Sequence, residues 1–453
     1  MKRNGQFIKF AFYLALLVSS SAWLTQFTAS QSQTIRRPKF SAPLKGTEIL
    51  LEADQIESKQ KRRGIWALEP RTGKARFLIP NGTRPFWSPK RNYIAYQEHN
   101  EIKVVDKTGR IEVSATPVFF EGGQLIGWGH NEEFILYTAP GLTGGFCFLR
   151  FNPKEPSLTE AGFVDPSEHF PGHHFGNPAI SPDGKYIVFE AFRYAPGIGK
   201  VSSKLVIAEL TVITRRISEL LEPDELARKK SYSVEIDVKN VRRLTSLPME
   251  FMEVNPQWSP DGRKIAFEIV GPQKVNRIVH VINLDGSGLK GLHLRIEKVK
   301  KIISWNTYHE EVVLLRVQEG LVTDMETYKD HDFKVIGWLS NSQIVVAQSI
   351  VDLTRYINPM NEPITGLLAL EIVDVEQRHP PILTLFTGRI SKFLCLSPWK
   401  KQFVWGEGFD DFLTSVYLFD IPKPQKTEQP YIQLPLPEPI RLPKSLAVYW
   451  ANW

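Results

Sequence analysis

Short apolar runs separated by turn residues follow one another along most of the chain. Two segments nearly coincide: NPAISPDGKYIVFE, from Asn177 to Glu190, aligns without a gap with NPQWSPDGRKIAFE, from Asn255 to Glu268. After Ser-Pro-Asp-Gly, apolar side chains recur at every second position, the period of a strand with one buried face. Proline followed by Asp and Gly is the chemistry of a tight turn. Each copy therefore predicts strand, turn, strand.

The same apolar spacing recurs elsewhere in the chain. An apolar anchor is followed by apolar residues seven and nine positions later, as Trp87 is by Ile94 and Tyr96. The anchors are Trp87, Trp128, Ile180, Trp258, Trp305, Leu396 and, in a looser copy, Trp338. Their steps scatter around the roughly 40 to 50 residues of a four-stranded propeller blade. The longest step contains the helix formers of residues 218–230, which we interpret as a helical insertion in a loop.

The two ends of the chain supply the parts of one more blade. Residues 48–54, 64–70 and 74–79 read as three strands, and residues 445–453 as the missing fourth. The Pro-rich segment 434–443 is expected to cross between blades in an extended path and not as a central strand. We therefore predict an all-β chain: a β-propeller of four-stranded blades, closed by pairing of the N- and C-terminal strands. Seven blades are expected, with six or eight as alternatives.

These motifs resemble a known family of repeats. The WSPDG turn at Trp258, the DGSG turn at 285–288 and the RRLT strand at 242–245 are similar to the WD-like repeats of TolB and of the propeller domains that precede some prolyl-oligopeptidase hydrolases. After Trp87 the pattern departs, because Lys90 and Arg91 replace Asp and Gly. The resemblance implies a β-propeller over residues 46–453. Too few residues precede it for the separate N-terminal domain of TolB.

The N-terminus predicts export. Lys2, Arg3 and Lys9 precede an apolar run over residues 10–24, the pattern of a secretory signal. That run is shorter than the roughly 20 residues of a membrane span. Residues 1–30 are interpreted as a signal peptide or an uncleaved signal anchor, and residues 31–45 as a linker. The expected location is periplasmic or extracellular, with anchoring in the inner membrane by the N-terminal segment left open.

Composition excludes several classes of protein. With 42% hydrophobic and 11% aromatic residues the chain is too apolar to be disordered. The net charge of +7 is spread along the chain without a basic run interleaved with aromatics, so no nucleic-acid partner is expected. Cys147 and Cys395 lie far apart in strand-like segments and are interpreted as small buried hydrophobes, not as a disulfide framework.

No catalytic, cofactor-binding or metal-binding residue is assigned from the sequence. There is no G-x-S-x-G elbow, since Gly286-Ser287-Gly288 reads as a hairpin turn, and no phosphate loop or paired-cysteine motif. Asp183 and Asp261 are interpreted as turn residues. His169, His173 and His174 leave two readings open: a transition-metal site completed by Asp165 or Glu168, or a polar loop at the rim.

The scaffold is compatible with more than one function. The favoured hypothesis is an exported, non-catalytic module that binds another envelope protein, a peptide or a ligand on its loops. The alternatives are a hydrolase or lyase built from loops and acting on glycans or peptides, and a structural role in an envelope complex. Enzyme activity stays open at this stage, with its absence favoured. Carboxylates or histidines converging at the channel would favour the enzyme.

Overall fold

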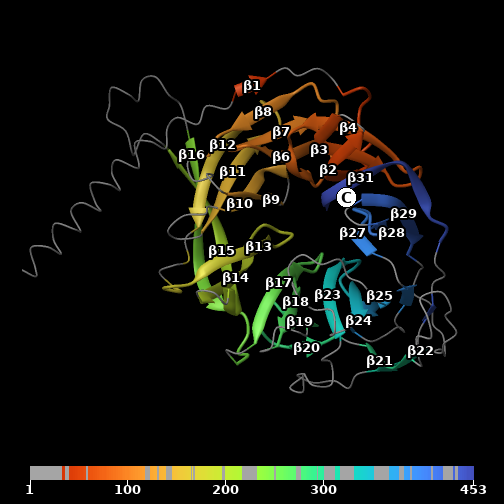
Figure 1. Ribbon diagram of the computed structural model, residues 1–453. Helices are drawn as coiled ribbons and strands as arrows, with labels where there is room; N and C mark the ends of the chain where they lie inside the picture. Colours follow the sequence, from red (N-terminus) through yellow and green to blue (C-terminus); the bar gives the residue numbers. More distant parts are fainter. Residues whose placement is uncertain are drawn as a thin grey trace, which may run out of the picture.

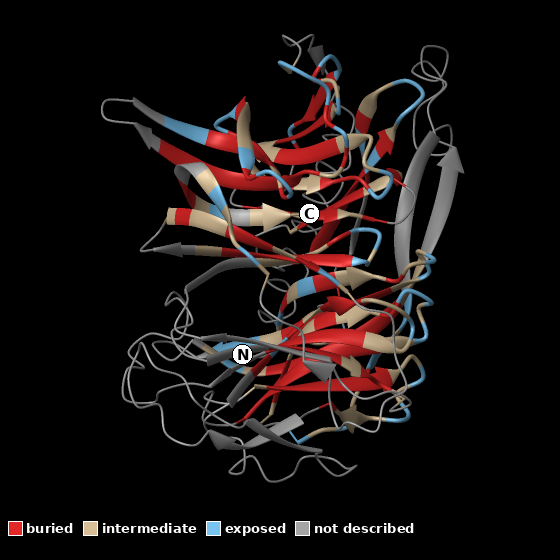
Figure 2. Cartoon of the chain, turned by 90° about the vertical axis from the view of Figure 1, so that its right-hand side faces the viewer, coloured by how far each residue is buried: buried red, intermediate tan, exposed pale blue. Residues whose placement is uncertain are grey.

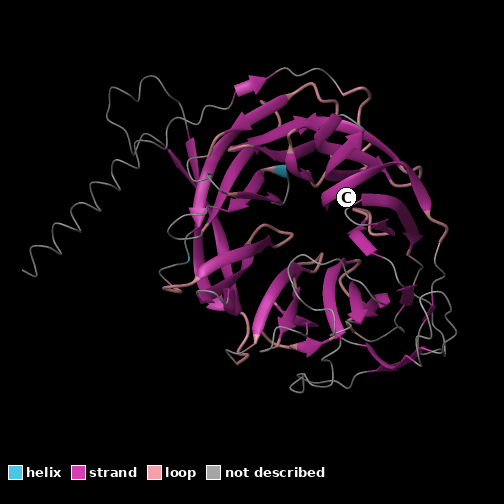
Figure 3. Ribbon diagram, viewed as in Figure 1, coloured by secondary structure: helices cyan, strands magenta, loops and turns pink. Residues whose placement is uncertain are grey.

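The computed structural model describes residues 33–35, 40–57, 60–117, 123–129, 132–138, 145–164, 166, 169–195, 199–216, 232–248, 251–271, 277–292, 294–299, 312–316, 331–350, 367–376, 382–387, 390–409, 412–421, 432–433 and 437–452. They form strands and turns almost throughout (Figure 3). The predicted signal segment and the predicted helical insertion lie outside this part of the chain. Within it, no helix has the length and apolar character needed to cross a membrane.

Antiparallel sheets arranged radially around one axis make up the molecule (Figure 1). Three of them are separate four-stranded meanders with an additional edge strand, β1 (Gln33–Ile35), on the first. Blade 2 contains β5 (Thr83–Trp87), β6 (Tyr93–Glu98), β7 (Glu101–Asp106) and β8 (Glu112–Ala115). Blade 3 contains β9 (Gln124–Trp128), β10 (Phe134–Thr138), β11 (Phe146–Asn152) and β12 (Ser157–Val164). Blade 4 contains β13 (His174–Ile180), β14 (Tyr186–Ala195), β15 (Gly199–Arg216) and β16 (Tyr232–Arg243).

Two further blades are linked by a single parallel pair, Arg277 with Asp332. Blade 5 contains β17 (Met252–Trp258), β18 (Lys264–Val270), β19 (Arg277–Asn283) and the short β20 (Lys290–Gly291). Blade 6 contains β23 (His331–Trp338), β24 (Gln343–Ile350), β25 (Leu367–Asp374) and β26 (Ile382–Thr387), edged by β30 (Ile432–Gln433).

One strand, β31 (Ile440–Asn452), is shared by the remaining two blades. Its first part pairs with β29 (Phe412–Asp420) and completes blade 7, while its second part pairs with β2 (Ile49–Glu57) and completes blade 1. Ala447 pairs with both strands. Blade 7 contains β27 (Ile390–Leu396), β28 (Gln402–Phe409) and β29 (Phe412–Asp420). Blade 1 contains β2 (Ile49–Glu57), β3 (Gln60–Glu69) and β4 (Lys74–Pro80). The predicted closure of the ring by the two chain ends is confirmed.

The Pro-rich segment differs in part from its prediction, because its last residues belong to β31. Ile440 and Arg441 pair with β29, and the pairing resumes only at Leu446. Pro443 lies in this interruption, where its missing N–H leaves no ladder bond unmade. A proline is therefore accommodated within a strand that contacts a neighbour on each side.

The blade anchor predicted at Trp305 lies outside the described residues. Downstream of it, β22 (Val312–Arg316) pairs with β21 (Leu294–Val299) in a two-stranded sheet. The degenerate copy at Trp338 is an anchor, 2% exposed at the end of β23. The described strands supply seven blades. Because residues 300–311 and 317–330 are not described, the predicted total stays a prediction.

The predicted Ser-Pro-Asp-Gly turns are confirmed in blades 4 and 5. Ser181 Oγ donates to Asp183 Oδ1 at 2.6 Å, and Gly184 adopts a left-handed φ of 74°. Although partial burial opposes it, hydrogen bonds from Ser181 and from the Lys185 amide hold the pKa of Asp183 below its usual value. Asp261 makes the equivalent bond with Ser259 at 2.7 Å. Both carboxylates thus serve turns, as the sequence indicates.

Anchor tryptophans join each blade to the preceding one. The indole N–H groups donate to inner-strand or adjacent backbone carbonyls: Trp87 to Glu48 at 3.0 Å, Trp128 to Phe86 at 3.1 Å, Trp258 to Ala179 at 2.9 Å and Trp338 to Gln257 at 3.2 Å. Trp258, at the end of β17, is only half-buried.

The first and last residues of the repeat also meet. Asn177 Nδ2 donates to Glu190 Oε1 at 2.6 Å, and Asn255 Nδ2 donates to Glu268 Oε2 at 2.9 Å. Glu190 also accepts the Asn255 backbone N–H of the next blade at 2.9 Å, and Glu268 accepts that of Val335 at 3.1 Å. These buried carboxylates therefore link neighbouring blades.

The apolar core lies mainly between adjacent blades, where buried residues line the strands (Figure 2). One cluster joins Leu50 and Ile65 of blade 1 to Ile94 and Tyr96 of blade 2. Cys147 is buried in β11, Cys395 lies in β27, and the two do not form a disulfide. Burial raises the pKa of Cys395 to about 12, so this thiol stays protonated and serves packing.

Candidate functional site

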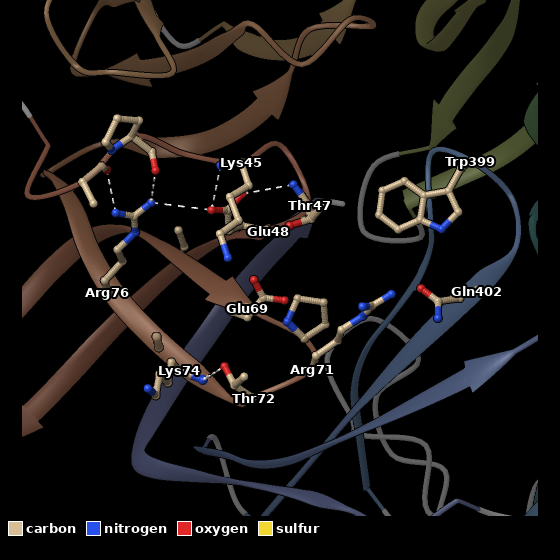
Figure 4. Close-up of a pocket in the computed structure, with 15 residues that line it drawn as sticks. Lys45, Thr47, Glu48, Glu69, Arg71, Thr72, Lys74, Arg76, Trp399 and Gln402 are labelled. Carbon is tan, nitrogen blue, oxygen red and sulfur yellow. Dashed lines mark hydrogen bonds and ion pairs between the residues drawn. The ribbon is translucent and has the colours of Figure 1, made fainter.

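A pocket of about 870 Å³ lies where the two ends of the chain meet in the ring (Figure 4). We call it the seam pocket. Its walls are residues 42–48, which precede β2, the turn between β3 and β4, and the turn between β27 and β28. Blades 1 and 7 both contribute, so closure of the ring assembles the pocket.

One wall is held by a buried carboxylate. Glu48 is 5% exposed and accepts the backbone N–H groups of Lys45, Gly46 and Thr47 at 3.0, 2.9 and 3.1 Å. Arg76 Nη2 lies 3.5 Å from the same carboxylate. Since its oxygens already accept these groups, Glu48 orders the segment and is not available as an acid or base.

Arg76 binds this wall from the side of β4. Its guanidinium donates to the carbonyl oxygens of Ala42 at 2.6 Å and Pro43 at 3.2 Å. This stretch of the chain is thus held through its backbone carbonyls. Figure 4 shows these bonds along one side of the pocket.

Three other cations line the pocket: Lys45, Arg71 and Lys74, all exposed. Among the described residues, none of them forms an ion pair. Glu69 is the one lining carboxylate besides Glu48 among those residues. Because Arg76 and Glu48 neutralise each other, the lining carries a surplus of positive charge. In Figure 4 the guanidinium of Arg71 extends toward the side formed by Trp399 and Gln402.

The turn that supplies Trp399 departs from the repeat. Ser397-Pro398-Trp399-Lys400 keeps the turn geometry, because Ser397 Oγ accepts the N–H groups of Lys401 and Gln402 at 3.1 and 3.0 Å. Trp399 replaces the turn Asp and is 39% exposed. Lys400 replaces the glycine and adopts a left-handed φ of 55°, which costs on the order of 1 kcal/mol or more for a residue with a side chain.

A hydrogen bond made by the Lys400 side chain offsets part of the cost of its left-handed backbone. Its Nζ donates to the Trp338 carbonyl at 2.5 Å, and burial lowers the pKa of this amine. The turn is thereby tied to blade 6, and Trp399 is held at the pocket edge by a fixed backbone. Trp399 was missed in the sequence, although the replacement of Asp-Gly by Trp-Lys after Ser397-Pro398 is a signal that could have found it.

A second degenerate turn supports the pocket from blade 2. Arg91 takes the glycine position with a φ of 58°, lies over the Trp87 ring at 4.9 Å, and donates to the Glu48 carbonyl at 3.2 Å. Burial lowers its pKa to about 10, with Glu48 opposing that shift. The guanidinium is therefore still charged at neutral pH. The wall containing Gly46 packs against the Arg91 side chain, since a Cβ on Gly46 would lie 3.2 Å from Arg91 Cβ.

The histidine cluster singled out in the sequence is not brought together. His169 is exposed, and His173 Nδ1 lies 3.2 Å from the Pro171 carbonyl. His174 begins β13 and contacts the rings of Phe192 and Tyr194 at 5.8 and 5.3 Å. The described residues contain no group of three side chains that could hold a metal ion. Asp165 and Glu168, which a metal site would need, lie outside them.

The carboxylates of the inner blade strands do not form an acid–base pair either. Glu190 bonds to Asn177, to the Asn255 amide and to Lys200, and Glu268 bonds similarly to Asn255, Val335 and Arg277. Burial raises the pKa of Glu268, although Arg277 opposes the shift. Ser287, in the Gly-Ser-Gly string, donates to Asp285 at 2.7 Å in the predicted turn. These groups serve structure.

The radial sheets, the shared closing strand and the Ser-Pro-Asp-Gly turns define the class: a closed β-propeller. No protein-family model and no curated protein matches the sequence. Among solved structures, the chain is similar to the β-propeller domain of the Trilobed protease from Pyrococcus furiosus, with 13% identity, a TM-score of 0.46 and coverage of 87% of this chain and 98% of that one.

Two other solved structures illustrate the range of propellers that it resembles. An oligogalacturonate lyase in complex with manganese is 11% identical, with a TM-score of 0.45 and coverage of 86% and 84% of the two chains. TolB from Acinetobacter baumannii is 12% identical, with a TM-score of 0.34 and coverage of 74% of this chain and 60% of that one. The assignment to the propeller class follows from the hydrogen-bonded order of this chain's own strands.

Proposed function

We propose that this protein is an exported, non-catalytic β-propeller that binds another protein, or a peptide of one, in the cell envelope through the seam pocket. The observation that carries the proposal is the pocket lining. Three exposed cations without an ion-pair partner among the described residues lie beside an exposed tryptophan. Arginine and tryptophan are enriched among residues that dominate binding energy, and rigid blades hold these side chains in place.

The bonding of the buried carboxylate in the pocket wall supports a binding role over catalysis. A general base needs a free lone pair within reach of the substrate. Glu48 is bonded to three backbone amides and Arg76. Export is supported by the charged and apolar pattern of residues 1–30. A propeller outside the cytoplasm meets envelope proteins as its partners.

Site-specific photo-cross-linking in cells tests the proposal. A cross-linking amino acid replaces Trp399 in one variant and Lys239, exposed on blade 4, in the control. We expect a specific adduct in the envelope fraction from position 399 and none from position 239. Identical adducts from both positions, or recovery of the protein in the cytoplasm, would contradict the proposal. Cleavage of peptides or glycans by the purified full chain would overturn its non-catalytic part.

A further inference from the structure

Resting on the proposed function, we infer that the seam pocket binds an acidic, extended peptide segment. Its carboxylates pair with Arg71, Lys45 and Lys74, and an apolar side chain of the segment packs on Trp399. The pocket volume of about 870 Å³ falls within the range of small-ligand sites, so a short segment enters and not a folded domain.

The surplus positive charge of the pocket lining favours an acidic ligand. Of the four cations that line the pocket, Arg76 is bonded to Glu48 and to two backbone carbonyls, whereas Lys45, Arg71 and Lys74 form no ion pair among the described residues. Glu69 is the one other lining carboxylate among the described residues, so the three cations exceed the negative charge that faces them, and like charges around one concave surface repel. A ligand with two or more carboxylates relieves that repulsion, and Arg71 offers a planar fork for one of them.

The replacement of the turn Asp by Trp399 favours a ligand with an apolar side chain. The turns of blades 4 and 5 carry an Asp that the serine bonds and a left-handed glycine. At the turn that faces the pocket, both stabilising residues are replaced, by an exposed indole and a left-handed lysine. Such a departure from favourable local chemistry points to a function for the residue. Trp399 is thus the apolar contact of the site.

The wall of the pocket favours a peptide over an anionic glycan. Residues 42–48 line it, and Arg76 binds the backbone carbonyl oxygens of Ala42 and Pro43 there. Pro43 and Pro70 also belong to the lining and offer apolar ring surface to a bound side chain. The wall thus already holds one stretch of polypeptide through its backbone carbonyls, and a peptide presents the same groups.

Fluorescence anisotropy of the full chain without residues 1–30 tests the inference. The probes are a fluorescein-labelled peptide Gly-Glu-Phe-Glu-Pro-Glu-Gly, its Glu-to-Gln analogue, and labelled oligogalacturonate as an anionic glycan. The pocket variants are Arg71→Gln with Lys74→Gln, and Trp399→Ala. The matched control is Lys154→Gln with Lys239→Gln, which removes the same charge from exposed positions away from the pocket.

We expect the acidic peptide to bind and the Gln analogue to bind at least tenfold more weakly. Each pocket variant should weaken binding roughly tenfold, the effect of losing a major contact, and the control variant should bind like the wild type. Equal binding by all variants, or no binding of the peptide, would overturn the inference. Pocket-dependent binding of oligogalacturonate alone would also overturn it while leaving the binding function intact. Cleavage of a probe would instead refute the proposed function.

Discussion

Ser88 Oγ donates a 2.5 Å hydrogen bond to Oε1 of Glu132, so a carboxylate from blade 3 stabilises the first anchor turn of blade 2. The same oxygen accepts the Lys90 N–H at 2.9 Å. In blade 4 the corresponding serine bonds to an Asp of its own turn, Asp183. The residue that the degenerate turn lacks in sequence is therefore replaced by one from the neighbouring blade, which makes the turn an inter-blade contact.

Removing this carboxylate should destabilise the ring. Glu132 is 5% exposed, and Glu132→Ala leaves the Ser88 hydroxyl and the Lys90 amide without their acceptor. We expect a loss of about 1–3 kcal/mol in the free energy of unfolding, measured by urea denaturation. The neighbouring Glu133→Ala is the control, because the side chain of Glu133 is 45% exposed and its carboxylate pairs with the exposed Arg150. Equal effects of the two substitutions would contradict the proposed role of Glu132.

Anchor tryptophans should differ in their contribution according to burial. Trp338 is 2% exposed, whereas Trp258 is half-buried. We expect Trp338→Ala to cost about 3–5 kcal/mol of stability and Trp258→Ala about half as much. Trp258→Phe, which retains most of the ring but loses the bond to Ala179, should cost about 1 kcal/mol. The reverse order in thermal melts would show that burial does not set the energy of these anchors.

Deleting residues 445–453 should open the ring. The segment contains Leu446 and Ala447, buried at 1% and 4% exposure, and pairs with both β29 and β2. Its removal exposes the edges of blades 1 and 7, so we expect a lower melting temperature and aggregation, measured by light scattering. Deletion of residues 33–35, which only edge blade 2, serves as the control. An unchanged melting temperature in the first deletion would refute closure by this strand.

Glu371 should make stability depend on pH. Its carboxyl is 1% exposed, has no hydrogen-bond partner among the described residues, and burial raises its pKa to about 8. The unfolded chain releases the proton near the ordinary value of 4.5, so this group destabilises the native state increasingly from pH 4.5 up to about 8.

Glu371→Gln should therefore raise the melting temperature at pH 8.5 and leave it nearly unchanged at pH 4.5. The expected difference at high pH is on the order of 5 kcal/mol, since each pKa unit corresponds to about 1.36 kcal/mol. The exposed Glu155→Gln controls for the loss of one carboxylate. A gain that is the same at both pH values would mean that the carboxyl is not protonated in the native state.

Local structure was encoded in the sequence. The fourteen-residue repeat predicted the turns at Ser181 and Ser259, because proline, Asp and glycine restrict the backbone over a few residues. Closure was also predictable, since the two chain ends each carried part of one four-stranded blade. Both features follow from short-range chemistry and from counting strands.

Contacts between distant segments were decided only by the tertiary structure. By spacing alone Trp338 was only a looser copy of the repeat, whereas the structure buries it at the end of β23, because apolar periodicity describes a strand and not the sheet that packs on it. Glu132 replaces a turn Asp from another blade, and the seam pocket combines residues 42–48 with Trp399. Ring closure brings these segments together, and local sequence patterns do not specify which residues then contact each other.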